Sequence, residues 1–375
     1  MRSVIMPMNN KVVILGCGHG GMALAAELTL KGAQVALWSH PNHASKLNKI
    51  ISQNEIIYQC QHKTHTITLD LMTTDLHEAL QFGNIIYNCT PMTAHRYLFK
   101  QLYLSLEKTR AIKIFINLSG VFSSIEQFLS AHDISIFNRL KIFDTSTFPF
   151  ACRAGERNDV MLLGKKSELT VAPLFSKDLF YLNMIPDHCK PIKFSHIENT
   201  FKIGLMGTNA TFHSATVLFN ARLIDNACSF LFYKEGISKR TSLLHEALDY
   251  ERITLAKTLG YTLKSCVEDD NKYYGTHFVN SYDFSTSSIV HKNVKSPISL
   301  NHRFVTEDVA YGLVPLWALG RLYNIKLANI ESVIQIFSTL MGMNYFLNGR
   351  NLMGLTKEMI HDMIWPNKMS ERTSA

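Results

Sequence analysis

The sequence predicts an α/β protein in which a doubly wound parallel sheet of the Rossmann type is followed by an all-helical domain. Four observations support this prediction. A glycine-rich loop follows the first apolar run, and further short apolar runs alternate with helical stretches up to about residue 166. From about residue 195 the apolar spacing becomes helical, and 375 residues fit two domains better than one. We expect the domains to occupy residues 1–192 and 193–375.

The first apolar run leads directly into the glycine motif. Residues 12–15 have the character of a buried strand, and Gly16, Gly18 and Gly21 follow in GxGxxG spacing. Gly16 permits the tight turn, Gly18 lets the backbone approach a pyrophosphate, and Gly21 lets the next helix pack closely on the strand. The first turn of that helix offers N–H groups to phosphates. A second strand at 35–38 completes the order expected of a dinucleotide-binding fold.

The residues after this second strand favour NADP over NAD. An acid usually stands there to bind the ribose hydroxyls of NAD. Here Ser39 and His40 follow Trp38, and the nearest downstream charge is Lys46. No carboxylate would repel a 2′-phosphate, and Ser39, His40 and His43 could donate hydrogen bonds to one. The alternative is that these are polar loop residues without such a role.

Further apolar runs at 84–91, 112–120 and 140–153 predict strands of the same sheet, and 160–166 predicts a strand of a late hairpin. The run at 84–91 ends in Thr90-Pro91, where we expect the nicotinamide. The expected cofactor contacts are Gly16, Gly18, His19, Gly20, Gly21, Ser39, His40, Thr90 and Pro91.

The second half is predicted to be helical. The pattern of residues 197–233 predicts one long helix or two consecutive helices, and that of 241–260 predicts a helix that stops at Gly260. Residues 266–297 are polar and loop-like, and two further helical segments end near Trp365. A Rossmann domain followed by helices is the architecture of several dehydrogenases of small 2-oxo or 2-hydroxy acids.

One stretch, "HRFVTEDVAYGLVPLWALG" (302–320), places charges at the start of an apolar helix. Arg303, Glu307 and Asp308 precede the apolar residues. Helix capping is one explanation, because Thr306 is a good N-cap residue and acids suit the first turn of a helix. A substrate site at this helix end is the other.

Composition excludes several classes of protein. The net charge of +8 comes from dispersed Lys and Arg without a basic cluster, which gives no support for nucleic-acid binding. No apolar run is long enough for a membrane span, and the apolar run near the start leads into the glycine motif, so we expect neither a membrane segment nor a signal peptide. Seven cysteines without CxxC pairs are typical of reduced, mostly buried thiols in a cytoplasmic protein, and no metal site is expected.

Four stretches together resemble the octopine/nopaline (opine) dehydrogenase family. The glycine loop is the least specific of them. "STFPFACR" (146–153) is similar to the family's segment that closes the nucleotide domain, and "NATFHSATVLFNA" (209–221) resembles its Asn-Pro-x-x-His segment. "RFVTEDVAYGLVPLWALGRLYNI" (303–325) is close to its Arg-Tyr-x-x-Glu-Asp signature and is the most specific match.

The resemblance implies a reductive condensation of an amino acid with a 2-oxo acid, pyruvate or 2-oxoglutarate, by NADPH or NADH. It implies His213 as catalytic acid/base, Asp308 as its charge partner, and Arg303 with Asn209 as substrate contacts. It also implies a helical domain like that at the C-terminus of 6-phosphogluconate dehydrogenase, in a monomer or homodimer. A histidine suits proton transfer near neutral pH, and a neighbouring carboxylate fixes its tautomer.

The sequence departs from the family pattern at Ala210 and Ala310, where proline is usual, and at Ser146, where an acid is common. Two other functions stay open. One is a simple 2-oxo or 2-hydroxy acid reductase of the glycerol-phosphate or ketopantoate dehydrogenase type, with Lys202 as its catalytic lysine. The other is a catalytically inactive nucleotide-binding protein.

Overall fold

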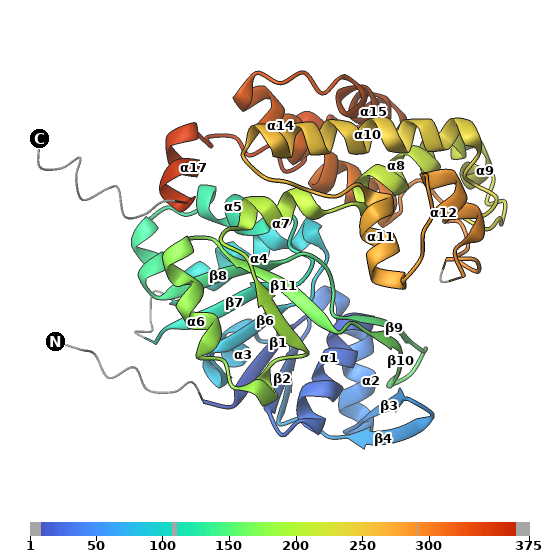
Figure 1. Cartoon of the computed structure of the whole chain (residues 1–375). Helices are drawn as coiled ribbons and strands as arrows, with labels where there is room; N and C mark the ends of the chain where they lie inside the picture. Colours follow the sequence, from blue (N-terminus) through green and yellow to red (C-terminus); the bar gives the residue numbers. More distant parts are fainter. Residues whose placement is uncertain (1–8, 107–110, 290, 365–375) are drawn as a thin grey trace, which may run out of the picture. The chain divides into compact units, whose positions relative to one another are not determined.

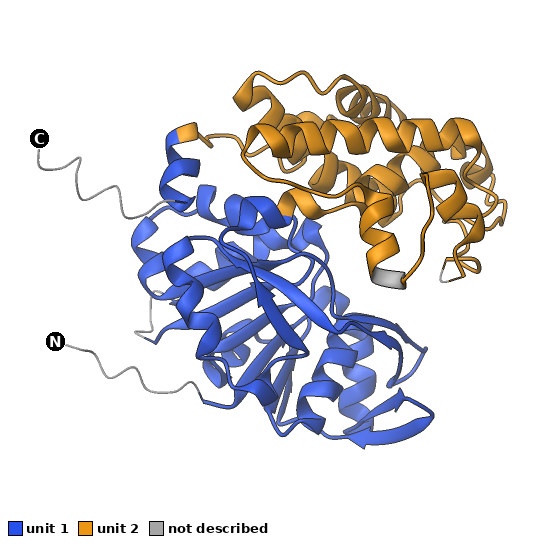
Figure 2. Cartoon of the chain, in the orientation of Figure 1, with its two compact units in different colours: residues 1–203, 358–375 blue, residues 204–357 orange. Residues whose placement is uncertain are grey.

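The computed structural model describes residues 9–106, 111–289 and 291–364. The chain divides into two compact units, shown in Figure 2: unit 1 is residues 1–203 with 358–375, and unit 2 is residues 204–357. We expected the boundary after residue 192. The sheet of unit 1 continues beyond that residue, because strand β12 (Lys193–His196) pairs in parallel with β11 (Glu168–Pro173).

Unit 1 contains an eight-stranded sheet in the order β12-β11-β8-β7-β6-β1-β2-β5 (Figure 1). Every neighbouring pair is parallel except β8 with β11. The apolar runs expected to be strands are confirmed as β1 (Lys11–Leu15), β2 (Gln34–Trp38), β6 (Ile85–Asn88), β7 (Lys113–Asn117) and β8 (Leu140–Thr145). The short edge strand β5 (Leu71–Thr73) completes the sheet. The doubly wound sheet expected from the sequence is therefore present.

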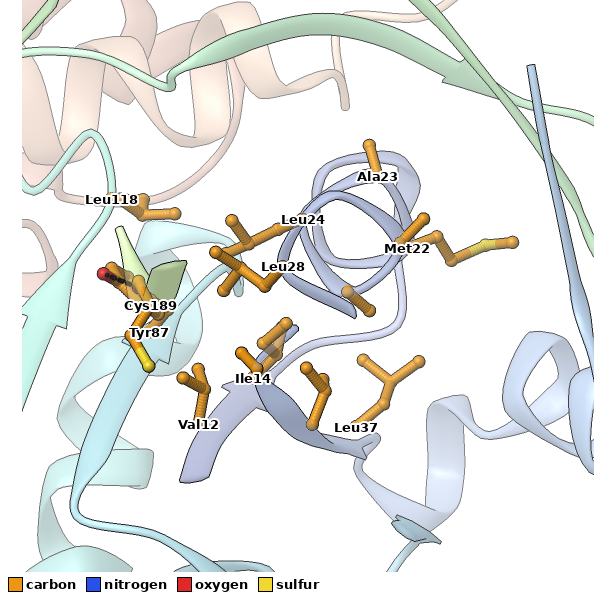
Figure 3. Close-up of a cluster of buried hydrophobic side chains, with 14 of the residues drawn as sticks. Val12, Ile14, Met22, Ala23, Leu24, Leu28, Leu37, Tyr87, Leu118 and Cys189 are labelled. Atoms are coloured by element: carbon orange, nitrogen blue, oxygen red, sulfur yellow. Dashed lines mark hydrogen bonds between the residues drawn. The ribbon is translucent and has the colours of Figure 1, made fainter. Parts of the chain in front are cut away.

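Helices connect the parallel strands of this sheet. Between consecutive strands lie α1 (His19–Leu30), α2 (Ser45–Gln53), α3 (Leu76–Phe82), α4 (His95–Leu106) and α5 (Ser123–Leu129). Short α6 (Phe180–Asn183) precedes β12, and α17 (Lys357–Ile364) belongs largely to unit 1. The core lies where α1 covers β1 and β2: Figure 3 shows α1 side chains gathered over Val12, Ile14 and Leu37, which are fully buried. Strands covered on both faces require such continuous apolar runs.

A second sheet in unit 1 has the order β4-β3-β10-β9. The late hairpin expected around 160–166 is confirmed by the antiparallel pair β9 (Phe150–Ala154) and β10 (Asp159–Lys165). The hairpin of β3 (Ile56–Cys60) and β4 (Lys63–Ile67) was not expected. Strand β10 joins the two hairpins by pairing in parallel with β3.

Unit 2 is helical, as expected. The segment 197–233, expected as one helix or two, forms three helices: α7 (Thr200–Met206), which begins in unit 1, α8 (Asn209–Phe219) and α9 (Ala221–Asp225). The expected helix ending at Gly260 is confirmed as α10 (Lys239–Thr258), and Gly260 has a φ of +84° just beyond it. The remaining elements are α13 (Arg303–Thr306), a π-helix η6 (Asp308–Leu313), α14 (Val314–Tyr323), α15 (Ala328–Leu340) and α16 (Tyr345–Asn348).

The expectation of a loop over 266–297 is wrong. Helix α11 (Cys266–Tyr274) begins with a capping box, in which the Ser265 hydroxyl accepts from the backbone N–H of Glu268 and the Glu268 carboxylate accepts from that of Ser265. Helix α12 (Ser281–Ser287) is capped by Asn280. These caps satisfy N–H groups that helices leave unpaired at their ends, so polar sequences are stable as helices here.

The expected end of the last helix near Trp365 lies outside the described residues. No helix in the described part of the chain is both long and apolar enough to cross a membrane. All seven cysteines are free, and four of them are buried.

Candidate active site

The glycine loop between β1 and α1 is shaped by close backbone contacts. Gly16 has a φ of +111°, which disfavours any residue with a side chain. A Cβ on Gly21 would lie 1.7 Å from the Gly16 carbonyl oxygen, so helix α1 can pack this closely only with glycine there. A Cβ on Gly20 would lie 2.4 Å from the ring of Phe148, a packing reason that sequence reasoning missed. Gly18 borders open space, as a backbone that approaches a ligand must.

The N-terminus of α1 is suited to an anion. Gly18 is its N-cap and has no side chain to form a capping bond, and a Cβ on Gly18 would meet no atom within 4 Å. The pKa of His19, in that first turn, is lowered by partial burial and by the positive charges of Arg153 and Lys46. The surroundings of the loop are therefore electropositive.

At the end of β2, His40 is better placed than Ser39 to meet an anion. Ser39 is buried, and its hydroxyl donates to the carbonyl of His43 at 3.1 Å. Half-buried His40 accepts a hydrogen bond from the Asn42 N–H at Nδ1, 3.2 Å away, which leaves Nε2 to carry the proton. The ring of Tyr97 lies 5.5 Å from that of His40.

Thr90 and Pro91 follow β6 beside the glycine loop. A Cβ on Gly16 would lie 3.2 Å from the Thr90 methyl, so the two loops touch. The Thr90 hydroxyl donates to Asn88 Oδ1 at 2.6 Å, and its carbonyl is 3.1 Å from His95 Nε2. These bonds fix the turn that ends the strand.

A buried carboxylate at the end of β8 was not identified from the sequence. Asp144 is fully buried and accepts hydrogen bonds from Asn117 Nδ2 (2.9 Å), Ser124 Oγ (2.7 Å) and Thr200 Oγ1 (2.6 Å). Its pKa is raised because burial outweighs these bonds. The network ties the first residue of α7 to the sheet.

In unit 2, His213 and Asp308 meet although they lie far apart in the sequence. His213 is on α8 and Asp308 begins the π-helix η6; Nδ1 of the imidazole is 2.7 Å from Oδ2 of the carboxylate. The side chains are only 10% and 6% exposed, so water does not screen the pair. The expected juxtaposition of these two residues is confirmed.

Close packing of α8 against η6 brings the pair together. A Cβ on Gly312 would lie 2.5 Å from Cβ of Ala210, so glycine at 312 permits the approach of the two helices. Ala210 is the position where the family has proline. A π-helix is rare and is often found at functional sites.

Aromatic side chains hold the His213 imidazole. The ring of Phe304 stacks on it with centroids 3.9 Å apart and an interplanar angle of 27°, and Phe232 meets it edge-on at 5.8 Å. The Tyr233 hydroxyl is 3.1 Å from Nε2. Because a carboxylate only accepts, Nδ1–H donates to Asp308, and in neutral His213 Nε2 accepts from Tyr233. Both ring nitrogens are thus engaged.

The capping explanation of residues 302–320 is wrong for Thr306. The N-cap of α13 is His302, whose Nδ1 accepts from the Phe304 N–H, and the Thr306 hydroxyl donates to the His302 carbonyl. Glu307 precedes the π-helix without a side-chain capping bond and lies 3.8 Å from Arg303.

Asn209 lies on α8, the helix that carries His213. Arg303 lies on α13, the short helix that precedes Asp308. Arg303 begins α13 with a side chain 59% exposed, and Asn209 begins α8 and is exposed. Neither hydrogen-bonds to His213 or Asp308 within the described residues. Phe304, the neighbour of Arg303, contacts the imidazole instead.

Two other histidines near the dyad are held neutral. Burial, reinforced by the charge of His213, lowers the pKa of His245 to about 3 and that of His291 to about 4. His245 Nε2 is 3.1 Å from the hydroxyl of Thr216, and His291 Nδ1 is 3.0 Å from that of Ser288. His213 differs from both in having a carboxylate partner.

Both halves of the chain match models of known protein families. Residues 196–341 match the family model described as "NAD/NADP octopine/nopaline dehydrogenase, alpha-helical domain". Residues 11–131 match the N-terminus of NAD-dependent glycerol-3-phosphate dehydrogenase. An opine dehydrogenase of Arthrobacter sp. (strain 1C) is 28% identical over 340 residues, which cover 90% of this chain and 93% of that relative.

Solved structures share the fold. An octopine dehydrogenase with NADH and L-arginine superposes with a TM-score of 0.74 at 17% identity, covering 94% of this chain and 98% of the other. A yersinopine dehydrogenase with NADP+ bound has a TM-score of 0.70 at 14% identity, covering 96% and 99%. Both similarities extend over nearly the whole of each chain and therefore include both compact units of this one.

Proposed function

Because this chain belongs to the octopine/nopaline (opine) dehydrogenase family of NAD(P)-dependent oxidoreductases acting on CH–NH groups, we propose that it condenses an amino acid with a 2-oxo acid reductively. The 2-oxo acid is pyruvate or 2-oxoglutarate, and the product is a secondary amine. The observation that carries the proposal is the buried His213–Asp308 pair, with 2.7 Å between Nδ1 and Oδ2.

The pair supplies a proton carrier for the two steps that need one. His213 first takes a proton from the substrate ammonium, and Asp308 stabilises the resulting imidazolium. The freed amine adds to the 2-oxo carbon, and His213 then returns the proton to the hydroxyl of the carbinolamine, which leaves as water. A bound nicotinamide cofactor supplies the hydride that reduces the iminium carbon. The histidine thus ends each cycle in its starting state.

The glycine loop and the residues around it fit a dinucleotide. Gly16 and Gly21 set the backbone, Gly18 borders open space, and the α1 N-terminus with His19 and Gly20 would hold the pyrophosphate. Thr90 and Pro91 would lie at the nicotinamide end.

We propose that NADPH is preferred to NADH. No carboxylate directly follows β2, and His40 offers an Nε2–H donor for a 2′-phosphate, whereas Ser39 is buried and its hydroxyl donates to the His43 carbonyl. The similar solved structures include several with NADH and one with NADP+, so both cofactors occur among similar proteins.

Arg303 would bind a substrate carboxylate. Its side chain is 59% exposed, and the contact it makes with a carboxylate of the described part of the chain, Glu307, is long at 3.8 Å, so its fork of N–H donors could form a bidentate interaction with a substrate. Exposed Asn209, one α-helical turn before His213, would contact the same substrate.

Two alternatives are tested with the same assay. A simple 2-oxo acid reductase would use Lys202, but this half-buried side chain on α7 has no hydrogen bond or ion pair from its ammonium group to any described residue. An inactive nucleotide-binding protein would not need the buried His213–Asp308 pair.

The test is oxidation of NADPH and NADH with pyruvate or 2-oxoglutarate, each with and without a panel of amino acids. The proposal expects oxidation only when an amino acid and an oxo acid are both present. Oxidation with the oxo acid alone would favour the simple reductase, and no oxidation with any pair would favour the inactive protein.

A further inference from the structure

The nitrogen through which His213 would act is covered by a phenol. Asp308 occupies Nδ1, so Nε2 must exchange the proton with substrate, yet the Tyr233 hydroxyl lies 3.1 Å from Nε2. A substrate would have to displace Tyr233 or exchange its proton through it.

Packing argues against displacement of either ring. The imidazole is stacked on Phe304, and the ring of Tyr233 contacts those of Phe232 (centroids 5.3 Å apart) and His291 (4.6 Å). Tyr233 itself is only 9% exposed. Because packing already restricts the Tyr233 side chain, holding its hydroxyl beside Nε2 costs little further side-chain entropy.

The backbone around Tyr233 is also held. The N–H of Phe232 donates to the Val294 carbonyl at 2.8 Å, and Leu231 forms an isolated β-bridge with Lys295. The N–H of Gly236 closes the turn on the Leu231 carbonyl at 3.1 Å. Backbone hydrogen bonds thus join residues 231–232 to residues 294–295 and close the turn over 231–236.

We propose that Tyr233 is a further catalytic residue, whose hydroxyl passes the proton between His213 Nε2 and the substrate. The inference rests on the proposed function. As the substrate ammonium gives a proton to the Tyr233 oxygen, the phenol proton moves to Nε2, leaving a neutral phenol and an imidazolium paired with Asp308. In the return step Nε2–H gives its proton to the phenol oxygen, and the phenol proton goes to the departing hydroxyl, which forms water.

The neighbouring groups fit this role. His291, whose ring lies 4.6 Å from that of Tyr233, has its Nδ1 3.0 Å from the Ser288 hydroxyl. Burial keeps its pKa near 4, so it is uncharged at neutral pH. The carboxylate of Asp308 contacts the other ring nitrogen of His213, Nδ1, at 2.7 Å.

The test is Tyr233→Phe, which keeps the ring and removes the hydroxyl. We expect kcat to fall by about 100-fold or more, the usual size of a proton-transfer contribution. The solvent-isotope proton inventory should change from two protons in flight to one. Tyr250→Phe is the matched control, because Tyr250 lies in the same unit with 71% of its surface exposed, and it should behave as wild type.

Two further measurements separate a relay from a packing role. Adding Tyr233→Phe to His213→Asn should cost little more than His213→Asn alone, because the groups act as a unit. Fluorinated tyrosine incorporated at position 233 should shift the pH profile of kcat with the acidity of its phenol. Turnover of Tyr233→Phe equal to or above wild type would mean that the hydroxyl only blocks the histidine and would overturn the inference, as would an unshifted profile.

Failure of the proposed function has a different signature. If wild-type protein oxidises neither cofactor with any amine and oxo acid pair, the condensation itself is wrong, and the inference falls with it. If wild type is active and His213→Asn is not, while Tyr233→Phe is fully active, only the relay is wrong.

Discussion

Replacing Asp308 with Asn should lower turnover by about two to four orders of magnitude, or about 3–5 kcal/mol of transition-state stabilisation. The carboxylate lies 2.7 Å from Nδ1 of His213, and with side chains only 10% and 6% exposed, solvent cannot replace the lost charge. An amide there can also present its NH2 group to Nδ1, which would favour the wrong imidazole tautomer.

The assay is steady-state oxidation of NADPH with saturating amino acid and 2-oxo acid. His213→Asn should be at least as impaired, and the double variant should lose little more than His213→Asn alone, because groups acting as a unit are not additive. Cofactor affinity should stay unchanged, since neither residue belongs to the glycine loop. Asp225→Asn, an exposed acid on α9, is the control and should retain full activity. Losses that multiply in the double variant would refute the dyad.

Three further predictions concern the cofactor, the substrate and stability. NADPH should bind more tightly than NADH, and His40→Asp should reverse this in a binding titration; a tenfold preference of wild type for NADH would contradict the role of His40. Arg303→Lys should raise the KM of a carboxylate substrate strongly, because an ammonium cannot form the bidentate fork, and a wild-type KM would exclude Arg303 from the site. Burial lowers the pKa of His245 from 6.5 to about 3. As the pH falls, His245 is therefore protonated in the unfolded chain before it is protonated in the folded protein. The folded protein thus loses stability between pH 6.5 and about pH 3. His245→Gln should remove about 1.4 kcal/mol per pH unit of this loss, as measured by urea unfolding at several pH values in that range, and an unchanged pH slope would show that His245 is not responsible.

The large sheet was predictable because parallel strands that are buried on both faces have nearly continuous apolar sequences. The runs at 12–15 and 113–117 are fully buried or nearly so and end at turn residues. The β3–β4 hairpin was not predictable in the same way. Its strand β4, "KTHTI", is largely exposed, and β3 finds its other partner in β10, far along the chain.

Helices α11 and α12 were missed for a related reason. Their sequences contain few apolar residues, and α12 buries Ser281 and Ser285 beside Phe284, so composition suggested a loop. Local signals were nevertheless present: Ser265 with Glu268 forms a capping box, and Asn280 is a favoured N-cap residue.

The candidate site was predictable where a motif carried it. His213, Asp308 and the glycine loop lie in segments that resemble a family, and the dyad residues meet as expected. Tyr233 and Phe304 were not identified, because they reach the imidazole through tertiary packing of a turn and of a short helix. The sequence predicted Ser39 as a cofactor contact, but it gave no indication that the Ser39 hydroxyl donates to the His43 carbonyl.

The most direct test of the proposed condensation follows the hydride itself. The protein is incubated with NADPH carrying deuterium at the transferable position, an amino acid and pyruvate, and the products are analysed by mass spectrometry. Opine chemistry predicts deuterium on the carbon that joins the new secondary amine to the carboxylate of the former pyruvate. Deuterium found instead in lactate, with no condensed product, would contradict the assignment.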